Sequence, residues 1–179
     1  MIKLIQAMCH LLEEGEDVVL ATVIDSAGST PRTKGSQMVV DAQGRTIETI
    51  GGGLVEAEVI KLAPEVFRAG RAQAKKIELT GRTVAKGDQM ICGGRMEILL
   101  EFIAATQENQ SMFRGLLEAL QNNPRSYRVI DLTDIGGFKG VMKRYLIQET
   151  RWCGENSLIR FPCWRRLPRE PARKDCLKF

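Results

Sequence analysis

The chain has 179 residues, of which 44% are hydrophobic and 27% charged, and its net charge at pH 7 is +4. This composition suits one globular domain and argues against wholesale disorder, and no apolar run approaches the roughly 18 residues of a membrane span. The charge is uneven, because residues 151–179 carry +5 and the rest of the chain carries −1, which is not the broad basic face of a nucleic-acid-binding protein.

The first predicted element is an amphipathic helix over residues 2–14. His10, the one histidine of the chain, is assigned to this helix stripe in a structural role, which removes most histidine-based acid–base and metal chemistry. A run rich in β-branched residues at 18–24 then predicts a buried strand. The apolar stripe of the helix consists of Ile2, Ile5, Met8, Cys9 and Leu12.

A β-hairpin is predicted next, with strands at 37–41 and 45–50 and its turn at 42–44. Three glycines then lead into a predicted helix over 54–70. Pro64 is expected to kink or split that helix, because proline lacks an N–H and disfavours a helical residue before it.

The second half of the chain continues with strands and one further helix and ends in an irregular tail. Because no βαβ unit repeats, the order favours an α+β fold in which helices pack on a mixed β-sheet. We expect a domain over residues 1–150 and an irregular basic tail over 151–179. The predicted elements are strands at 74–80, 95–104, 127–133 and 140–150 and a helix at 107–121.

The N-terminal sequence lacks the pattern of a secretory signal, because no small-residue cleavage site follows its helical stretch. Cysteines stand at positions 9, 92, 153, 163 and 176, an odd number without CxxC spacing. This usage indicates free thiols in a reducing compartment. We therefore expect a cytoplasmic protein with neither a membrane nor nucleic acid among its partners.

The first of three glycine-rich loops, "GSTPRTKGSQM", begins at Gly28. Gly28 and Gly35 allow the backbone to approach a ligand, and Pro31 stiffens the loop between them. Arg32 offers a planar, permanently charged fork for phosphate or carboxylate, and Ser29 adds a hydroxyl. The alternative is a surface loop with a solvated arginine.

The second loop is the run Gly51, Gly52 and Gly53 between a strand and a helix. Free N–H groups at a helix N-terminus attract anions, and glycines leave no Cβ in the way. Glu56 in the first turn suits the helix dipole without any catalytic role. The alternative is a tight connection in which only glycine fits.

The third loop contains "MICGGRME", in which Cys92 precedes Gly93 and Gly94. Backbone N–H groups and nearby Arg95 would favour a thiolate, which binds soft metals or carries persulfide sulfur. The alternative is a small hydrophobic residue in a turn. If the three loops meet, they form an anion pocket with a thiol at its rim.

The stretches "GSTPRTKG", "IGGGLVEAEV" and "MICGGRMEILLE", in this order, resemble the XdhC/CoxI family. Its members are accessory proteins for the maturation of molybdenum hydroxylases such as xanthine dehydrogenase and carbon monoxide dehydrogenase. The resemblance covers roughly residues 10–105 and corresponds to the N-terminal domain of the family. Nothing in residues 106–179 resembles the Rossmann-like C-terminal domain of longer members.

The resemblance implies a chaperone that carries the molybdenum cofactor, molybdopterin, supports its sulfuration with a cysteine desulfurase, and delivers it to a hydroxylase. A homo-oligomer such as a dimer is expected. Leu54 departs from the family, which has cysteine after the third glycine, so Cys92 is the implied metal ligand. The implied cofactor-binding residues are Gly28, Ser29, Pro31, Arg32, Gly51, Gly52, Gly53, Glu56, Cys92, Gly93 and Gly94.

Two alternatives stay open at this point. In the first, the chain is a sulfurtransferase-like enzyme that carries a persulfide on Cys92. In the second, it is a dimerising scaffold that has lost its ligand. The leading hypothesis is a cofactor-binding accessory protein that does not turn over a substrate, and the sequence leaves open which hydroxylase it serves.

Overall fold

The computed structural model describes residues 1–79, 93–122, 126–130 and 144–148. The chain divides into two compact units, one of which runs from Glu16 to Ala104. The other combines Met1–Gly15 with Ala105–Phe179. Cys92 and the predicted tail at 151–179 lie outside the described residues, so what was predicted for them stays a prediction.

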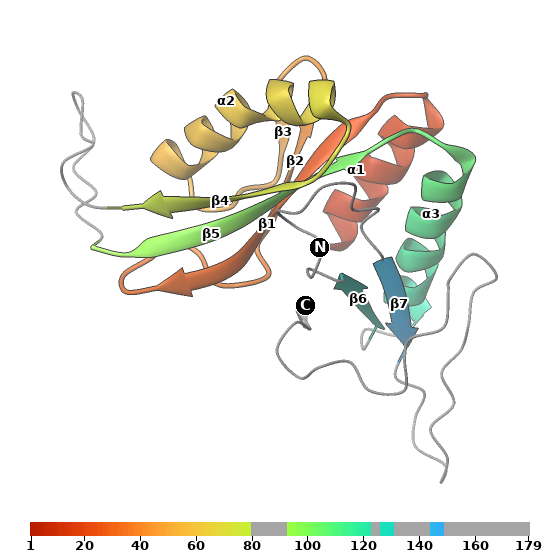
Figure 1. Ribbon diagram of the computed structural model, residues 1–179. Helices are drawn as coiled ribbons and strands as arrows, with labels where there is room; N and C mark the ends of the chain where they lie inside the picture. The colour runs from red at the N-terminus through yellow and green to blue at the C-terminus, as the bar shows by residue number, and fades with distance from the viewer. Residues whose placement is uncertain (80–92, 123–125, 131–143, 149–179) are drawn as a thin grey trace, which may run out of the picture. The chain divides into compact units, whose positions relative to one another are not determined.

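The unit from Glu16 to Ala104 is built on a five-stranded sheet in the order β3-β2-β1-β5-β4 (Figure 1). The α+β class is confirmed, but every pairing in this sheet is antiparallel, where the sequence predicted a mixed sheet. Three of the four pairings join strands that follow each other in the chain, and a chain that reverses in this way pairs antiparallel. The strands are β1 (Val18–Ala27), β2 (Gln37–Asp41), β3 (Thr46–Ile47), β4 (Gln73–Glu78) and β5 (Arg95–Ile103).

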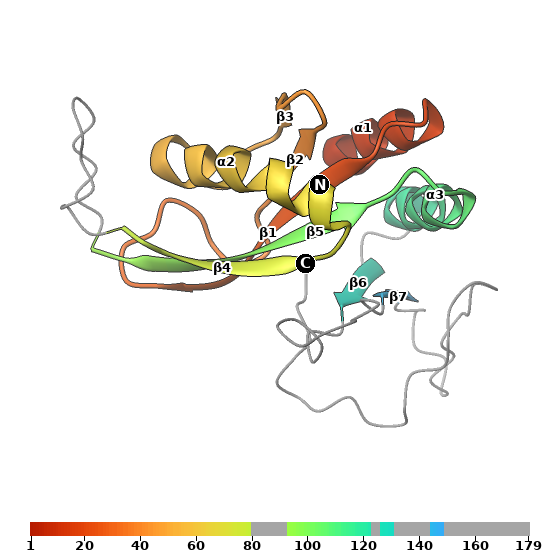
Figure 2. The same ribbon diagram turned by 45° about the horizontal axis from the view of Figure 1, so that its top comes forward.

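Helix α2 (Gly53–Ala69) covers one face of this sheet (Figures 1 and 2). Its inward positions, Val55, Val59, Ala63 and Val66, are buried against apolar side chains of the sheet, as expected for an amphipathic helix. Pro64 does not split the helix. Proline removes one backbone hydrogen bond, and its exposed position leaves room for water to replace that bond.

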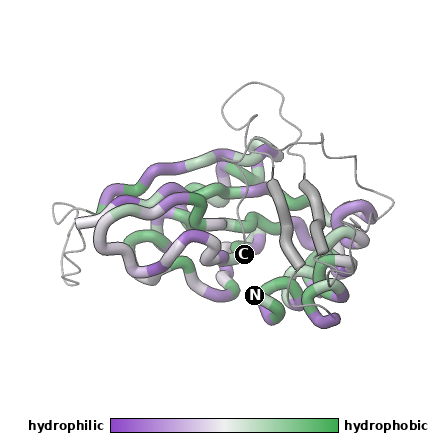
Figure 3. Tube along the Cα trace, turned by 90° about the horizontal axis from the view of Figure 1, so that it is seen from below, coloured by the Kyte–Doolittle hydropathy of each residue, from purple (hydrophilic) through white to green (hydrophobic). Residues whose placement is uncertain are grey.

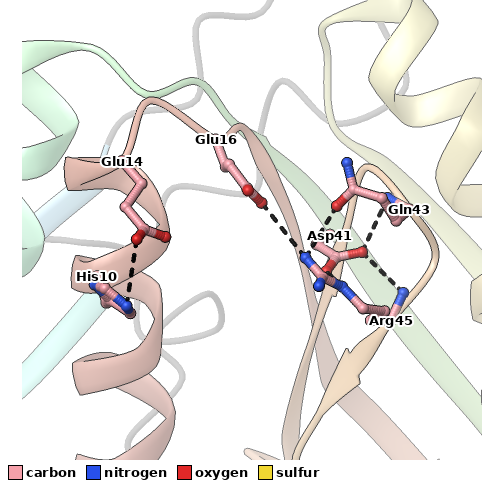
Figure 4. Close-up of polar contacts among 6 residues, drawn as sticks. All are labelled: His10, Glu14, Glu16, Asp41, Gln43 and Arg45. Atoms are coloured by element: carbon pink, nitrogen blue, oxygen red, sulfur yellow. Dashed lines mark hydrogen bonds and ion pairs between the residues drawn. The ribbon is translucent and has the colours of Figure 1, made fainter.

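The hairpin turn between β2 and β3 is held by the buried carboxylate of Asp41 (Figure 4). Asp41 Oδ1 accepts hydrogen bonds from the backbone N–H groups of Gln43 (2.9 Å) and Arg45 (2.8 Å). Asp41 Oδ2 pairs with Arg45 Nε at 2.5 Å, which raises the arginine pKa, and Glu16 lies 3.9 Å from the same guanidinium. The second strand is shorter than predicted, because Glu48 adopts a left-handed φ of 64° directly after Ile47.

In the second unit, helices α1 (Ile2–Glu13) and α3 (Gln107–Asn122) lie side by side (Figure 1). Gln110 Nε2 donates to the carbonyl oxygen of Leu12 at 2.7 Å, and Arg114 Nη2 pairs with Glu13 at 2.7 Å. Strands β6 (Ser126–Ile130) and β7 (Arg144–Gln148) form an antiparallel pair.

The predicted apolar stripe of α1 is correct except at Ile2, which is exposed, and Leu4 is buried in addition. The assignment of His10 to this stripe is wrong. Its side chain is 72% exposed and lies 3.5 Å from Glu14, one turn further along the helix (Figure 4). His10 directly follows the buried Cys9, and a step of about 100° around a helix is enough to move a side chain from the core to solvent.

The hydropathy colouring in Figure 3 shows apolar and polar residues interleaved along the chain. This interleaving is what amphipathic elements with one buried side require. Among the residues that the structure describes, no helix is both long and apolar enough to cross a membrane.

Candidate functional site

The first glycine-rich loop connects β1 to β2 and extends beyond the end of their pairing. Beyond Val23, strand β1 pairs only with β5, as far as Ala27 opposite Arg95. The loop returns to β1 through two backbone hydrogen bonds of 2.9 Å, from Gly35 N–H to the Val23 carbonyl and from Val23 N–H to the Ser36 carbonyl. Gly28 and Gly35, with φ of 76° and 89°, make the two bends.

The third loop packs against the first, backbone against backbone. A Cβ on Gly28 would lie 2.9 Å from the Gly93 carbonyl oxygen, and a Cβ on Gly94 would lie 2.3 Å from the Ser29 carbonyl oxygen. Both separations are too short for a real Cβ, so glycine is required here for close approach. The Leu79 N–H donates to the Gly94 carbonyl at 2.8 Å and ties the same point to the end of β4.

The triple-glycine turn also packs against the first loop. Gly51, Gly52 and Gly53 all have positive φ, of 144°, 70° and 50°. A Cβ on Gly51 would lie 2.8 Å from Cγ of Pro31 and 3.9 Å from Cγ of Arg32. The segments around Gly51 and Gly94, far apart in the sequence, therefore both contact the first loop, at Pro31 and at Ser29, in the unit from Glu16 to Ala104.

Two backbone N–H groups of the triple-glycine turn are already engaged within the protein. Gly52 N–H donates to Glu56 Oε1 at 2.9 Å, and Gly51 N–H donates to Thr49 Oγ1 at 3.3 Å. The Thr49 hydroxyl also donates to Glu56 Oε1 through a short hydrogen bond. The sequence prediction missed Thr49; a hydroxyl before a glycine turn, followed by an acid in the first helical turn, was the available signal.

The loops that contact one another carry exposed cations. Arg32 is exposed, its carbonyl accepts a 3.1 Å hydrogen bond from Thr30 Oγ1, and it forms no ion pair with a described residue. Lys34 Nζ lies 2.6 Å from Asp25 Oδ1, and this hydrogen bond lowers the aspartate pKa, with Arg95 contributing through its charge. Arg32 is thus a cation of the loops that is open to an anionic ligand.

The thiol part of the prediction remains untested, because Cys92 lies outside the described residues. Cys9 is buried, and burial followed by the charge of Glu13 raises its pKa to about 11, so this thiol is protonated at neutral pH. The residues that the structure describes contain no cluster of three or more His, Cys, Asp or Glu side chains that could hold a metal.

Comparison with known proteins matches residues 11–78 to the model of the XdhC and CoxI family. Over this segment the chain is similar to members of the XdhC and CoxI family. This segment includes the loop from Gly28 to Gly35 and the triple-glycine turn, and the predicted resemblance is confirmed over it. The third loop lies beyond the matched segment.

Two curated proteins are similar to part of this chain. An uncharacterized protein of Escherichia coli, YqeB, is 34% identical over 93 residues, which cover 50% of this chain and 16% of YqeB. A Bacillus subtilis protein, described as a probable subunit of xanthine dehydrogenase, is 41% identical over 51 residues, which cover 28% of this chain and 16% of that protein. The match thus spans about a sixth of each relative.

The fold is similar to that of a solved structure, described as a xanthine dehydrogenase from Bacillus halodurans. The TM-score is 0.62 with 20% sequence identity, and the match covers 79% of this chain and 42% of the other. At this identity the likeness extends to the fold alone.

Proposed function

We propose that this chain is an accessory protein that binds molybdopterin and supports its maturation and its insertion into a molybdenum hydroxylase. The observation that carries the proposal is the packing of the loops around Gly51 and Gly94 on the loop that begins at Gly28, where Arg32 forms no ion pair with a described residue. Similarity to the XdhC and CoxI family over residues 11–78 supports the class of function. The Bacillus subtilis relative, whose name refers to xanthine dehydrogenase, supports a hydroxylase of that type as the client. A hydroxylase of the carbon monoxide dehydrogenase type is the other client that the proposal includes.

Molybdopterin is cargo in this proposal, so the chain needs to recognise it and does not need to transform it. The cofactor carries a phosphate, which suits the guanidinium fork of Arg32. Its metal is bound by sulfur, and the thiolate of Cys92, next to Gly93, is the proposed protein ligand. The proposal includes a cysteine desulfurase partner that supplies sulfur, a cytoplasmic location and self-association.

The experiment that tests this function is a titration of the purified chain with molybdopterin, followed by absorbance. Arg32→Ala is expected to weaken binding by about tenfold or more, since a charge-assisted hydrogen bond contributes roughly 1.5–3 kcal/mol. Cys92→Ser is expected to weaken it as well. Arg71→Ala is the matched control, because Arg71 is equally exposed but follows the C-terminal end of α2.

Two results would count against the proposal: no measurable uptake by the wild type, or unchanged affinity in the Arg32 and Cys92 variants. Incubation with a cysteine desulfurase distinguishes the proposed accessory protein from the sulfurtransferase-like enzyme. If Cys92 gains the mass of one sulfur atom and molybdopterin does not bind, the chain is a sulfur carrier.

A further inference from the structure

The carboxylate of Glu56 closes the triple-glycine turn from within. Its Oε1 atom accepts hydrogen bonds from the Thr49 hydroxyl and from Gly52 N–H, the latter at 2.9 Å. The Thr49 oxygen accepts in turn from Gly51 N–H at 3.3 Å. These two side chains, from either side of the turn, form what is called here the Thr49–Glu56 clamp.

The turn needs such a clamp because its backbone is unusually free. Glycine populates positive and negative φ about equally, so the values at Gly51, Gly52 and Gly53 are not favoured by the residues themselves. Glu48, just before Thr49, has a φ of 64° that side-chain-bearing residues rarely adopt. Surrounding contacts must hold this segment, and the clamp and the packing of Gly51 on Pro31 are contacts that do so.

An anion that bound the amides of Gly51 and Gly52 would have to displace Thr49 and Glu56. It would also meet the negative charge of the carboxylate, since no described residue forms an ion pair with Glu56. Displacement and repulsion both disfavour phosphate there. Arg32, whose Cγ would lie 3.9 Å from a Cβ on Gly51, is a nearby group for which no described residue is such a competitor.

We infer that Thr49 and Glu56 are positioning residues, which hold the turn against Pro31 and so set the place of Arg32, and that neither touches the ligand. This inference, which for the ligand rests on the proposed function, revises the assignment of Gly51, Gly52 and Glu56 as cofactor contacts. Phosphate is then bound by the first loop through Arg32, and the amides of the turn stay within the protein.

The first test needs no ligand: amide hydrogen exchange at Gly51 and Gly52 in the full chain. Glu56→Ala and Thr49→Val are expected to speed exchange several-fold, because each removes a hydrogen-bond partner. Glu56→Gln and Thr49→Ser keep the accepting oxygen and should exchange like the wild type. Glu58→Ala is the matched control, because it removes an acid from the same helix turn that pairs with Lys61 instead.

The second test is the affinity for molybdopterin. Glu56→Ala should weaken binding several-fold and Glu56→Gln should restore it, with the salt dependence of the wild type in both. Arg32→Ala should flatten that dependence, because it removes a charge that meets the ligand.

The positioning role is overturned if Glu56→Gln fails to rescue affinity, since the negative charge itself would then matter. It is also overturned if Glu56→Ala binds molybdopterin more tightly, since the freed amides would then be the phosphate site. If the wild type takes up no molybdopterin, the proposed function fails, and the clamp is then tested by the exchange rates alone. Unchanged protection of the Gly51 and Gly52 amides in Glu56→Ala would refute the clamp.

Discussion

The hairpin turn at Asp41–Arg45 and the contacts between the glycine-rich loops both depend on glycine, but for different reasons. Gly44 has a φ of 80° and open space around the position where a Cβ would stand. Gly94 has no positive φ, yet a Cβ there would lie 2.3 Å from a backbone oxygen. The hairpin turn uses glycine for its backbone angle, and the loops use it for close approach.

The two regions also differ in how their charged side chains are paired. In the hairpin turn, the carboxylates of Asp41 and Glu16 both face Arg45, so the guanidinium is paired locally (Figure 4). At the loops, Glu56 accepts from neutral donors, and Arg32 forms no ion pair within the described residues. The charged groups of the hairpin turn pair with one another, whereas the loops present a cation, Arg32, that pairs with no described residue.

The largest expected effect is the difference between Gly94→Ala and Gly44→Ala. Alanine at 94 forces backbone against backbone, and overpacking of this severity costs about 3 kcal/mol. Alanine at 44 meets nothing and should cost about 1 kcal/mol for its left-handed angle. Urea unfolding of both variants measures the two costs, and equal costs would remove the distinction between the two uses of glycine.

The next effect compares the two carboxylates that hold turns. Asp41→Ala leaves the amides of Gln43 and Arg45 without their acceptor and should cost about 2 kcal/mol of unfolding free energy. Asp41→Asn keeps one acceptor oxygen and should cost less. Molybdopterin affinity should be unchanged in both folded variants, unlike in Glu56→Ala, and a drop in affinity would mean that the hairpin turn also shapes the site.

The elements of the fold were largely predictable from periodicity. Helix α1 ends one residue from its predicted bound, and the strand predicted at 18–24 is the start of β1. The purely antiparallel pairing was not predicted, because which strands become neighbours depends on contacts between distant segments. His10 was misplaced because its position relative to the core depends on a single step around the helix.

The sequence predicted which segments form the site, but not what the individual residues of those segments do. The order of the three motifs pointed to Gly28, Gly51 and Gly94, which the structure brings together. The sequence could not show that Gly94 is needed for packing on Ser29, or that Thr49 reaches Glu56, seven residues further on. Both depend on how the chain folds back, which local pattern does not encode.

The smallest expected effect concerns an ion pair of the first loop, between Lys34 and Asp25. The hydrogen bond from Lys34 holds the Asp25 pKa below its ordinary value, so the pair stabilises the fold above the unfolded-state pKa of about 3.9. That contribution is lost as the pH falls through the folded-state pKa. It should be slight and weaker at high salt, because both side chains are exposed.

Lys34→Ala should therefore raise the Asp25 pKa toward its ordinary value, as followed by NMR titration of the side-chain carboxyl carbon. An unchanged pKa would mean that Lys34 does not hold the loop.

The same variant separates the cations of the loops by role. Lys34 is engaged by Asp25 and Arg32 is not, so Lys34→Ala should leave molybdopterin affinity close to that of the wild type while Arg32→Ala lowers it. Equal losses in the two variants would indicate a diffuse positive field in place of a specific arginine contact.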